Sequence, residues 1–250
     1  VNYGLLTTSR GCPVAVSVYE GNTNDAKTLL PQVRKLKDDF GIKRLVIAGD
    51  RGMISQKAID EIKDIDGIDW ITALKSGQIR ALLDGGHLQL GLFDEKNLFE
   101  LSHPDFPGER LVACRNAELA KLRHHKRESL LEATKQELTK VKGMVERRRL
   151  RDAAAIGVRV GKVVNKYKVA KHLALDIADD RFDFHVLAEE VKAEAALDGI
   201  YVIRTSVPKK RLSAADTVRS YKLLSTVERA FRSLKTVDLK VRPIHHRLED

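Results

Sequence analysis

Two sets of residues in this sequence have types and spacing suited to chemistry on a phosphate group. The first is Asp50, which directly follows the short apolar and β-branched run 44–48. In open α/β sheets, ligands gather at the carboxyl ends of the strands, so a carboxylate there can face a metal ion or a phosphate. The preceding strand would fix its position. The alternative interpretation is an Asp that caps a helix or lies in a loop.

The second set lies on one stripe of a predicted C-terminal helix. Glu228, Arg232 and Lys235 share a face of that helix, and Tyr221 lies two turns earlier. The carboxylate can hold a cation, while the basic groups and the phenol can hold phosphates. The alternative is a ladder of salt bridges between residues one turn apart, which is the commoner explanation of such a stripe.

A sheet and several helices must position these residues, and local patterns predict both. Alternating apolar residues predict strands, and apolar residues at helical spacing predict helices. The predicted order is a β-hairpin (1–8 and 12–19), a helix ending at 41, a buried strand (44–48), a helix capped by Ser55, a strand (69–74), long helices (117–150), a buried strand (200–204) and a helix (214–234). Residues 77–108 are rich in Gly, Asp and Pro, which predicts loops with local β structure.

The positive charge is concentrated in one segment. The chain has a net charge of +10, from 45 Lys and Arg against 35 Asp and Glu, and all of the excess lies between residues 121 and 171. A localised basic block attracts polyanions by counterion release, so nucleic acid is the expected partner and an anionic membrane surface a weaker one. Candidate DNA contacts are Arg147, Arg148, Arg149 and Arg151. The alternative is a solvated helical arm.

Length and composition exclude several classes of protein. The 250 residues suit one domain, or one domain with a large insertion, and no apolar run approaches the roughly 18 residues that a membrane span requires. Cys12 and Cys114 are too few for a disulfide framework or a zinc site. No signal peptide is visible, so a cytoplasmic location is expected. Because the sequence begins with Val1, we expect a fragment or a processed product.

The C-terminal stripe resembles a signature of a known family. Tyr221, Glu228 and Lys235 match three positions of the Y-x2-R-x3-E-x6-K signature of bacterial DDE transposases of the insertion-sequence-4 family. The Arg position is occupied by Leu224, so Lys222 or Arg229 would have to compensate for one DNA contact. Segments 1–8, 21–25 and 48–53 are similar to the strands and the second-aspartate region of the same family.

The resemblance implies an α/β fold, namely a ribonuclease H-like mixed sheet with flanking helices. A mostly helical, basic insertion would interrupt it, which gives a first core part (1–76), an insertion region (77–186) and a second core part with the catalytic-Glu helix (187–250). In that fold the first catalytic Asp lies on the strand before the hairpin. Since this chain begins at the hairpin, we expect the first strand and its Asp to be missing.

The resemblance also implies metal-dependent cleavage and transfer of DNA strands. Two Mg²⁺ ions about 4 Å apart would act on the phosphate, and Mn²⁺ would substitute. Asp50 and Glu228 would be catalytic metal ligands, while Tyr221, Lys235 and, more weakly, Arg232 would contact DNA. The expected partner is double-stranded DNA, both transposon ends and target, bound by a homodimer in the bacterial cytoplasm beside the nucleoid. Without the first Asp, the chain alone should be inactive.

Three other functions stay open at this point. One is a different ribonuclease H-like nuclease, which the Tyr, Glu and Lys spacing argues against. Another is a DNA-binding transposase remnant without catalytic activity, which the missing first strand favours. The third is a structural protein that self-associates through the helices near 117–150, although Gly143 breaks the regular seam that a long coiled coil requires.

Overall fold

The computed structural model describes residues 2–8, 10–89, 91, 93 and 97–237. The chain forms two compact units. Unit 1 comprises residues 1–114 and 201–250, and unit 2 comprises residues 115–200. The division into 1–76, 77–186 and 187–250 stays a prediction. None of the helices in the described ranges is long and apolar enough to cross a membrane.

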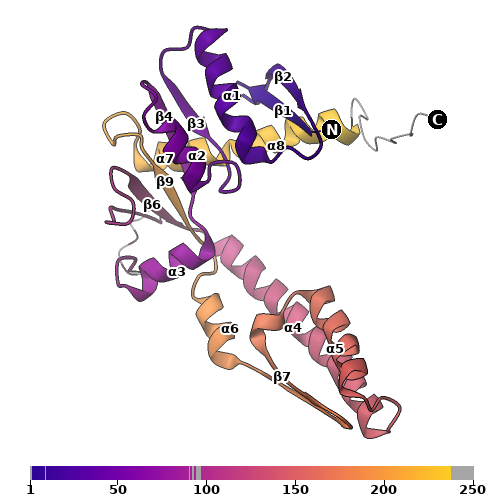
Figure 1. Cartoon of the computed structure of the whole chain (residues 1–250). Coiled ribbons are helices and arrows are strands. Elements are labelled where there is room, and N and C mark those ends of the chain that lie inside the picture. The colour runs from indigo at the N-terminus through magenta and orange to yellow at the C-terminus, as the bar shows by residue number, and fades with distance from the viewer. Residues whose placement is uncertain (1, 9, 90, 92, 94–96, 238–250) are drawn as a thin grey trace, which may run out of the picture. The chain divides into compact units, whose positions relative to one another are not determined.

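Unit 1 is built on a five-stranded mixed sheet with the order β3-β4-β9-β6-β5 (Figure 1). β3 is parallel to β4, whereas β4 is antiparallel to β9 and β5 is antiparallel to β6. The predicted mixed α/β architecture is therefore confirmed, and β3 is an edge of the sheet. Its strands are β3 (Leu45–Ala48), β4 (Ile68–Ala73), β9 (Ile200–Thr205), β6 (Arg110–Arg115) and β5 (Leu98–Leu101).

The predicted N-terminal hairpin forms a separate two-stranded sheet. β1 (Asn2–Thr7) pairs antiparallel with β2 (Pro13–Tyr19). Gln32 donates hydrogen bonds from Nε2 to the hydroxyls of Ser17, at 3.0 Å, and of Tyr19. These bonds hold the hairpin against α1 (Asp25–Asp38).

Helices cover both faces of the main sheet. Residues along β4 alternate between the two faces. Ile68 and Trp70 pack with α1 and α2 (Gln56–Ile62), whereas Ile71 packs in the cluster that includes Val218 of α7 (Ala214–Lys222). The predicted cap of α2 is confirmed, because Ser55 Oγ accepts a hydrogen bond from the Ala58 amide at 3.3 Å.

The predicted C-terminal helix is divided into three parts. α7 ends at Lys222, α8 covers Leu224–Arg232, and a π-helical turn, η3, covers Ser233–Val237. The joint residue Leu223 keeps right-handed helical angles, with φ −62° and ψ −17°. The chain therefore follows a helical path through the joint, although a single regular helix over 214–234 was wrong.

The stretch 77–108 contains more regular structure than predicted. It holds most of α3 (Ser76–Asp84) and the strand β5. Gln78 Oε1 accepts a hydrogen bond from the Lys75 amide at 3.0 Å, which stabilises the start of α3, and Ile79 and Leu82 are buried. This buried face sustains a helix despite the glycines around it.

Unit 2 combines an antiparallel helix pair with a strand pair (Figure 1). Helices make up most of its regular structure, as predicted for the insertion, but the sequence patterns did not predict β7 and β8, which form an antiparallel hairpin. Its elements are α4 (Ala117–Glu146), α5 (Ala153–Tyr167), the 3₁₀ turn η2 (Ala170–His172), β7 (Leu173–Ala178), β8 (Arg181–Val186) and α6 (Ala188–Ala195).

The β7–β8 hairpin has a clear alternating pattern that identifies it. Leu173, Leu175 and Ile177 pair across the strands with Val186, Phe184 and Phe182, so that one face is apolar. Five of these six side chains belong to the core shared with α4 and α5. The strands are joined by a two-residue turn whose second residue, Asp180, has a φ of +55°. The apolar face therefore explains why this segment is a sheet rather than a helix.

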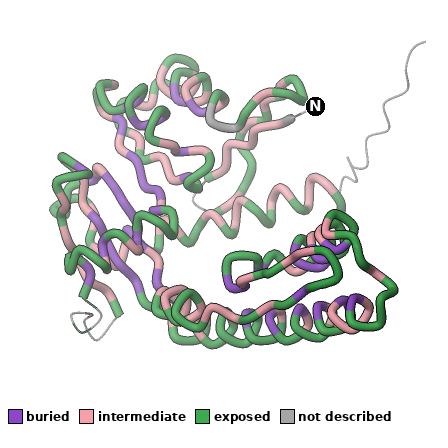
Figure 2. Tube along the Cα trace, turned by 60° about the horizontal axis from the view of Figure 1, so that its bottom comes forward, coloured by how far each residue is buried: buried purple, intermediate pink, exposed green. Residues whose placement is uncertain are grey.

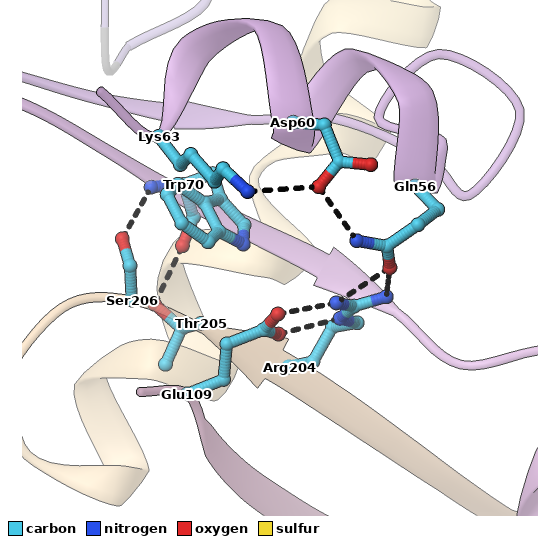
Figure 3. Close-up of polar contacts among 8 residues, drawn as sticks. All are labelled: Gln56, Asp60, Lys63, Trp70, Glu109, Arg204, Thr205 and Ser206. Atoms are coloured by element: carbon cyan, nitrogen blue, oxygen red, sulfur yellow. Dashed lines mark hydrogen bonds and ion pairs between the residues drawn. The ribbon is translucent and has the colours of Figure 1, made fainter. Parts of the chain in front are cut away.

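A buried ion pair connects three parts of unit 1. Arg204 on β9 donates from Nε to Glu109 Oε2 at 2.6 Å and from Nη2 to Glu109 Oε1 (Figure 3). Gln56, at the start of α2, accepts from both terminal nitrogens of Arg204 at 3.1 Å. The guanidinium also lies 4.8 Å from the ring centre of Phe106. Since both charged side chains are over 90% buried, each depends on the other for compensation.

Removal of one partner of this pair should destabilise unit 1 strongly. Glu109→Gln leaves the Arg204 charge buried without a counter-charge, and we expect a loss of about 3–5 kcal/mol in the free energy of unfolding. Trp70, the one tryptophan, is buried in unit 1, so fluorescence during urea unfolding reports on this unit. The control Lys209→Gln removes an exposed partner of Glu100 and should change stability by about 1 kcal/mol or less. Equal losses in the two variants would contradict the prediction.

Candidate active site

Asp50 is held by the backbone around it at the carboxyl end of β3. The Gly49 amide continues the strand pairing by donating to Ile71 O at 3.1 Å. Asp50 Oδ1 accepts hydrogen bonds from the amides of Gly52 and Met53, each at 2.8 Å. The alternative interpretation, an Asp that caps a loop, is therefore also correct for this oxygen. The second oxygen, Oδ2, accepts no hydrogen bond from the described residues, so it can bind an external cation.

Glycine at position 49 is required for this close packing. A Cβ atom on Gly49 would lie 2.8 Å from Cγ1 of Ile54, whose side chain is buried. A Cβ atom on Gly52 would lie 3.2 Å from Asp50 Oδ1, the oxygen that accepts the two amide hydrogen bonds. The small residues on either side therefore let the chain turn tightly around the carboxylate.

Glu228 lies exposed on α8. Among the residues that the structure describes, its carboxylate has neither a hydrogen bond nor an ion pair, and Arg232 one turn later does not engage it. Arg229 instead donates to Thr226 Oγ1 at 3.4 Å. The salt-bridge ladder is therefore not formed within the described part of this helix. The carboxylate stays available to a ligand.

Tyr221 connects the two carboxylates. Its hydroxyl is half-buried, and burial is the largest cause of its raised pKa. The negative charges of Asp50 and Glu228 raise this pKa further, while the positive charge of Arg51 lowers it. Since a phenol with a raised pKa stays protonated, Tyr221 is a hydrogen-bond donor at neutral pH. The structure thus brings Asp50 and Glu228 each within electrostatic reach of Tyr221.

The sheet side of Tyr221 holds neutral groups. Burial is the main cause that raises the pKa of Cys114 to about 11, against smaller lowering effects of Tyr201 and Lys222. The pKa of Tyr201 is also raised, by burial and then by Cys114 and Tyr221. A thiol that stays protonated is neither a nucleophile nor a metal ligand at neutral pH. The charged chemistry is therefore confined to the side of Tyr221 where Asp50 and Glu228 lie.

Lys235 is held by aromatic rings. Its Nζ lies 5.6 Å from the ring centre of Tyr3 and 5.5 Å from that of Phe231, and these two rings stack on each other at 6.1 Å. Arg232 is exposed on the last turn of α8. The four other predicted DNA contacts, Arg147, Arg148, Arg149 and Arg151, lie in unit 2.

Arg51 is a site residue that the sequence patterns did not single out. It is exposed and directly follows Asp50, and its charge acts on Tyr221. Two residues were considered as substitutes for the signature Arg. The charge of Lys222 lowers the pKa of Cys114, and Arg229 donates a hydrogen bond to Thr226. The sequence feature that could have identified Arg51 is its position directly after the candidate carboxylate Asp50.

The donor set fits part of a divalent-metal site. Asp50 and Glu228 both have carboxylate oxygens that no described residue engages, and such hard oxygen donors suit Mg²⁺ and Mn²⁺. No group of three or more His, Cys, Asp or Glu residues that could hold a metal ion occurs within the described ranges. Two carboxylates are therefore present where the expected chemistry uses three.

The comparison with protein families decides the general identity of this site. A family model described as Transposase DDE domain matches residues 4–250. The chain belongs to the transposase DDE domain family. This family consists of polynucleotidyl transferases that act on DNA and generally use divalent metal ions. Neither the curated proteins nor the solved structures contain a match to the chain.

The electrostatic coupling within this transposase site can be measured through Tyr221. Glu228→Gln removes a negative charge that raises the pKa of Tyr221, so we expect that pKa to fall, and Arg51→Gln should raise it. Ultraviolet titration of tyrosinate, with Tyr221→Phe to assign the transition, measures both shifts. The control Glu61→Gln changes an exposed α2 residue that does not act on Tyr221. An unchanged Tyr221 pKa in Glu228→Gln would show that the two side chains are not neighbours.

Proposed function

We propose that this chain is the catalytic part of an insertion-sequence-4-type DDE transposase, which cleaves and transfers DNA strands when an insertion sequence moves. The observation that carries the proposal is that Asp50 and Glu228 both lie close enough to Tyr221 for their negative charges to raise its pKa. These two carboxylates come from elements 178 positions apart in the sequence. The match to the Transposase DDE domain supports the same assignment.

In this proposal Asp50 and Glu228 are the catalytic metal ligands. Asp50 offers Oδ2, because Oδ1 is engaged by two backbone amides. Glu228 offers both oxygens from an exposed position on α8. Divalent cations such as Mg²⁺ or Mn²⁺, when bound there, would activate the attacking oxygen and stabilise the leaving oxygen of the phosphodiester.

Tyr221 and Lys235 orient the DNA in this proposal. The protonated Tyr221 hydroxyl can donate a hydrogen bond to a phosphate oxygen beside the carboxylates. Lys235 presents a cation that lies near the Tyr3 and Phe231 rings, and Arg232 adds an exposed cation one turn earlier on the helical path. Charge-assisted hydrogen bonds of this kind are about twice as strong as neutral ones, so they suit a phosphate backbone.

In this proposal a third carboxylate comes from a strand that is not among the described residues of this chain. β3 is an edge of the main sheet, and its residue Val46 is 38% exposed although its neighbours are apolar. β1 and β2 form their own sheet. A further strand that pairs with the free edge of β3 would complete a ribonuclease H-like sheet and bring an acid beside Asp50. In this proposal the chain alone has little or no strand-transfer activity.

A DNA-binding remnant without catalysis is the second candidate function. The observation that favours it is the presence of two carboxylates rather than three at the described site. Both candidates share DNA as the partner, and both allow a homodimer that holds two DNA ends. Only the transposase proposal requires that Asp50 and Glu228 act in a cleavage reaction.

Metal-dependent nicking separates these candidates. The chain alone, with Mg²⁺ or Mn²⁺ and supercoiled plasmid that carries the ends of the element, should produce little nicked circle. A chain extended by the reading frame that precedes Val1 should nick, and Asp50→Asn or Glu228→Gln should each reduce the rate by about 10³-fold or more because a metal ligand is lost. The control Glu61→Gln should keep the rate of the extended chain.

Two outcomes would contradict parts of this proposal. Robust nicking by the chain alone, abolished by Glu228→Gln, would show that no essential acid is missing. Nicking by the extended chain that survives both Asp50→Asn and Glu228→Gln would remove the proposed catalytic roles. An extended chain that binds DNA and does not nick it would favour the remnant.

A further inference from the structure

The cations of unit 2 fall into two groups according to their partners. One group is compensated by acids of the same unit. Lys142 Nζ lies 2.9 Å from Asp183 Oδ1, Arg181 Nη2 lies 2.7 Å from Asp176 Oδ2, and Lys135 pairs with Glu132 at 3.8 Å. These three cations lie on or beside the β7–β8 sheet or on α4, and Lys166 of α5 is likewise paired, with Glu137. Their charge is already largely balanced within the protein.

The second group has no ion pair with any residue that the structure describes. All of its members are exposed and belong to α4, α5 or the turn between these helices. The second group contains Arg123, Lys126, Lys140, Arg147, Arg148, Arg149, Arg159 and Lys162. These residues therefore carry charge that an external anion can use.

The directions of the ion pairs show where the second group lies. Lys142 points toward the sheet, because its partner Asp183 is on β8. Glu137 points along the opposite side, where it pairs with Lys166 of α5 at 2.7 Å. At about 100° per residue, Lys140 lies about 60° from Glu137 and about 160° from Lys142 around the axis of α4. Lys140 is therefore on the side of α4 turned away from the strand pair.

The charged residues on the same side of α5 are all basic. Arg159, Lys162 and Lys166 lie within about 60° of one another around the α5 axis. The Lys166–Glu137 pair places this face along the outer side of the α4–α5 seam. α5 contains no Asp or Glu between 153 and 167. In Figure 2, exposed residues recur along the long helix α4 between the buried residues of its core face.

At the end of the seam, the turn after α4 extends the cationic surface. Arg147, Arg148 and Arg149 follow the carboxyl end of α4, and Arg148 has a φ of +55°, as helix-terminating residues often have. Arg151 approaches Asp180 at 3.9 Å and is therefore partly compensated. From this turn to Lys166, α5 extends about 20 Å. We call the surface formed by Lys140, Arg147, Arg148, Arg149, Arg159 and Lys162 the seam face.

We infer that the seam face is a docking surface for the phosphate backbone of duplex DNA. A 20 Å length of duplex carries about 12 phosphate charges, so six exposed cations along the face can be matched at ordinary spacing. A membrane is a poorer fit, because the apolar residues of α5, Ile156, Val160, Val163 and Val164, are buried in the core of unit 2. Backbone contacts of this type hold DNA without reading its sequence.

This inference rests on the proposed function in one respect, namely that DNA is the substrate. It adds Lys140, Arg159 and Lys162 as DNA contacts and assigns a smaller contribution to the compensated cations. The inference concerns binding by unit 2 alone, so it does not depend on the carboxylates of unit 1. Failure of nicking would therefore leave it standing.

The salt dependence of DNA binding tests the seam face. The probe is a fluorescent 25-base-pair duplex of arbitrary sequence, titrated with the full chain at several salt concentrations. The triple variant Lys140→Gln, Arg159→Gln, Lys162→Gln should reduce the slope of log K against log salt by about 2.7, since each lost phosphate contact removes about 0.9. The matched control Lys135→Gln, Lys142→Gln, Arg181→Gln has the same change in net charge and should reduce the slope by less than about 1.

Several outcomes would overturn the inference. Equal slope changes in the two triple variants would show that net charge rather than the seam face decides binding. An unchanged slope in the seam-face variant would show that DNA docks elsewhere. Binding of the chain to vesicles of phosphatidylserine and phosphatidylcholine but not to the duplex would identify a membrane surface instead. Circular dichroism spectra and melting curves that match the wild type ensure that only exposed charge has changed.

Discussion

The uncompensated negative charge around Tyr221 is the constraint on which the site depends. Asp50 is positioned by two backbone amides and Glu228 by its place on α8, and within the described chain neither carboxylate has a cationic partner bound to it. Glu109, in contrast, is buried and has its charge compensated by Arg204. Carboxylates that are fixed and left open are suited to an external cation. Burial contributes most to the raised pKa of Tyr221, and the charges of these two carboxylates raise it further.

The two units differ in which of their charged side chains have ion-pair partners. Unit 1 buries its strongest ion pair and leaves two carboxylates open, whereas unit 2 pairs its cations on the strand side and leaves them open on the seam face. A phosphodiester substrate needs both features, because cations attract the backbone from solution and carboxylates hold the metal that acts on one bond. In unit 2, the exposed cations without an ion pair to a described residue thus lie mostly on α4, α5 and the turn between these helices.

Local patterns predicted the elements that are locally determined. The hairpin at 1–19, the strand before Asp50, the helix capped by Ser55 and the strand at 200–204 were all confirmed, because alternation, turn residues and capping residues act over a few positions. The β7–β8 hairpin was missed despite a regular apolar alternation. The break at Leu223 has no evident signal, since Leu223 keeps helical angles and its neighbours suit a helix.

Sequence spacing was enough to propose the candidate site residues. It could not predict which of their charged side chains would form ion pairs. The signature spacing singled out Tyr221 and Glu228, which lie two turns apart along the helical path, and the position of Asp50 followed from the strand before it. The same spacing predicted a salt-bridge ladder equally well, and which of the two forms depends on side-chain contacts that only the tertiary structure gives. Lys166 illustrates the reverse case, because its partner Glu137 lies 29 positions away on another helix.

Leu224 occupies the position at which the signature has an Arg, and the structure shows another source of positive charge near Tyr221. A basic residue at 224 would stand one turn after Tyr221 and one turn before Glu228 on the same side of the helical path. Leu224 is instead half-buried and carries no charge. The cation that acts on Tyr221 is Arg51, which comes from the turn after β3 and opposes the effect of the two carboxylates. Positive charge at this site therefore arises from the element that carries Asp50, so that the acid and its neighbouring cation are positioned by the same strand.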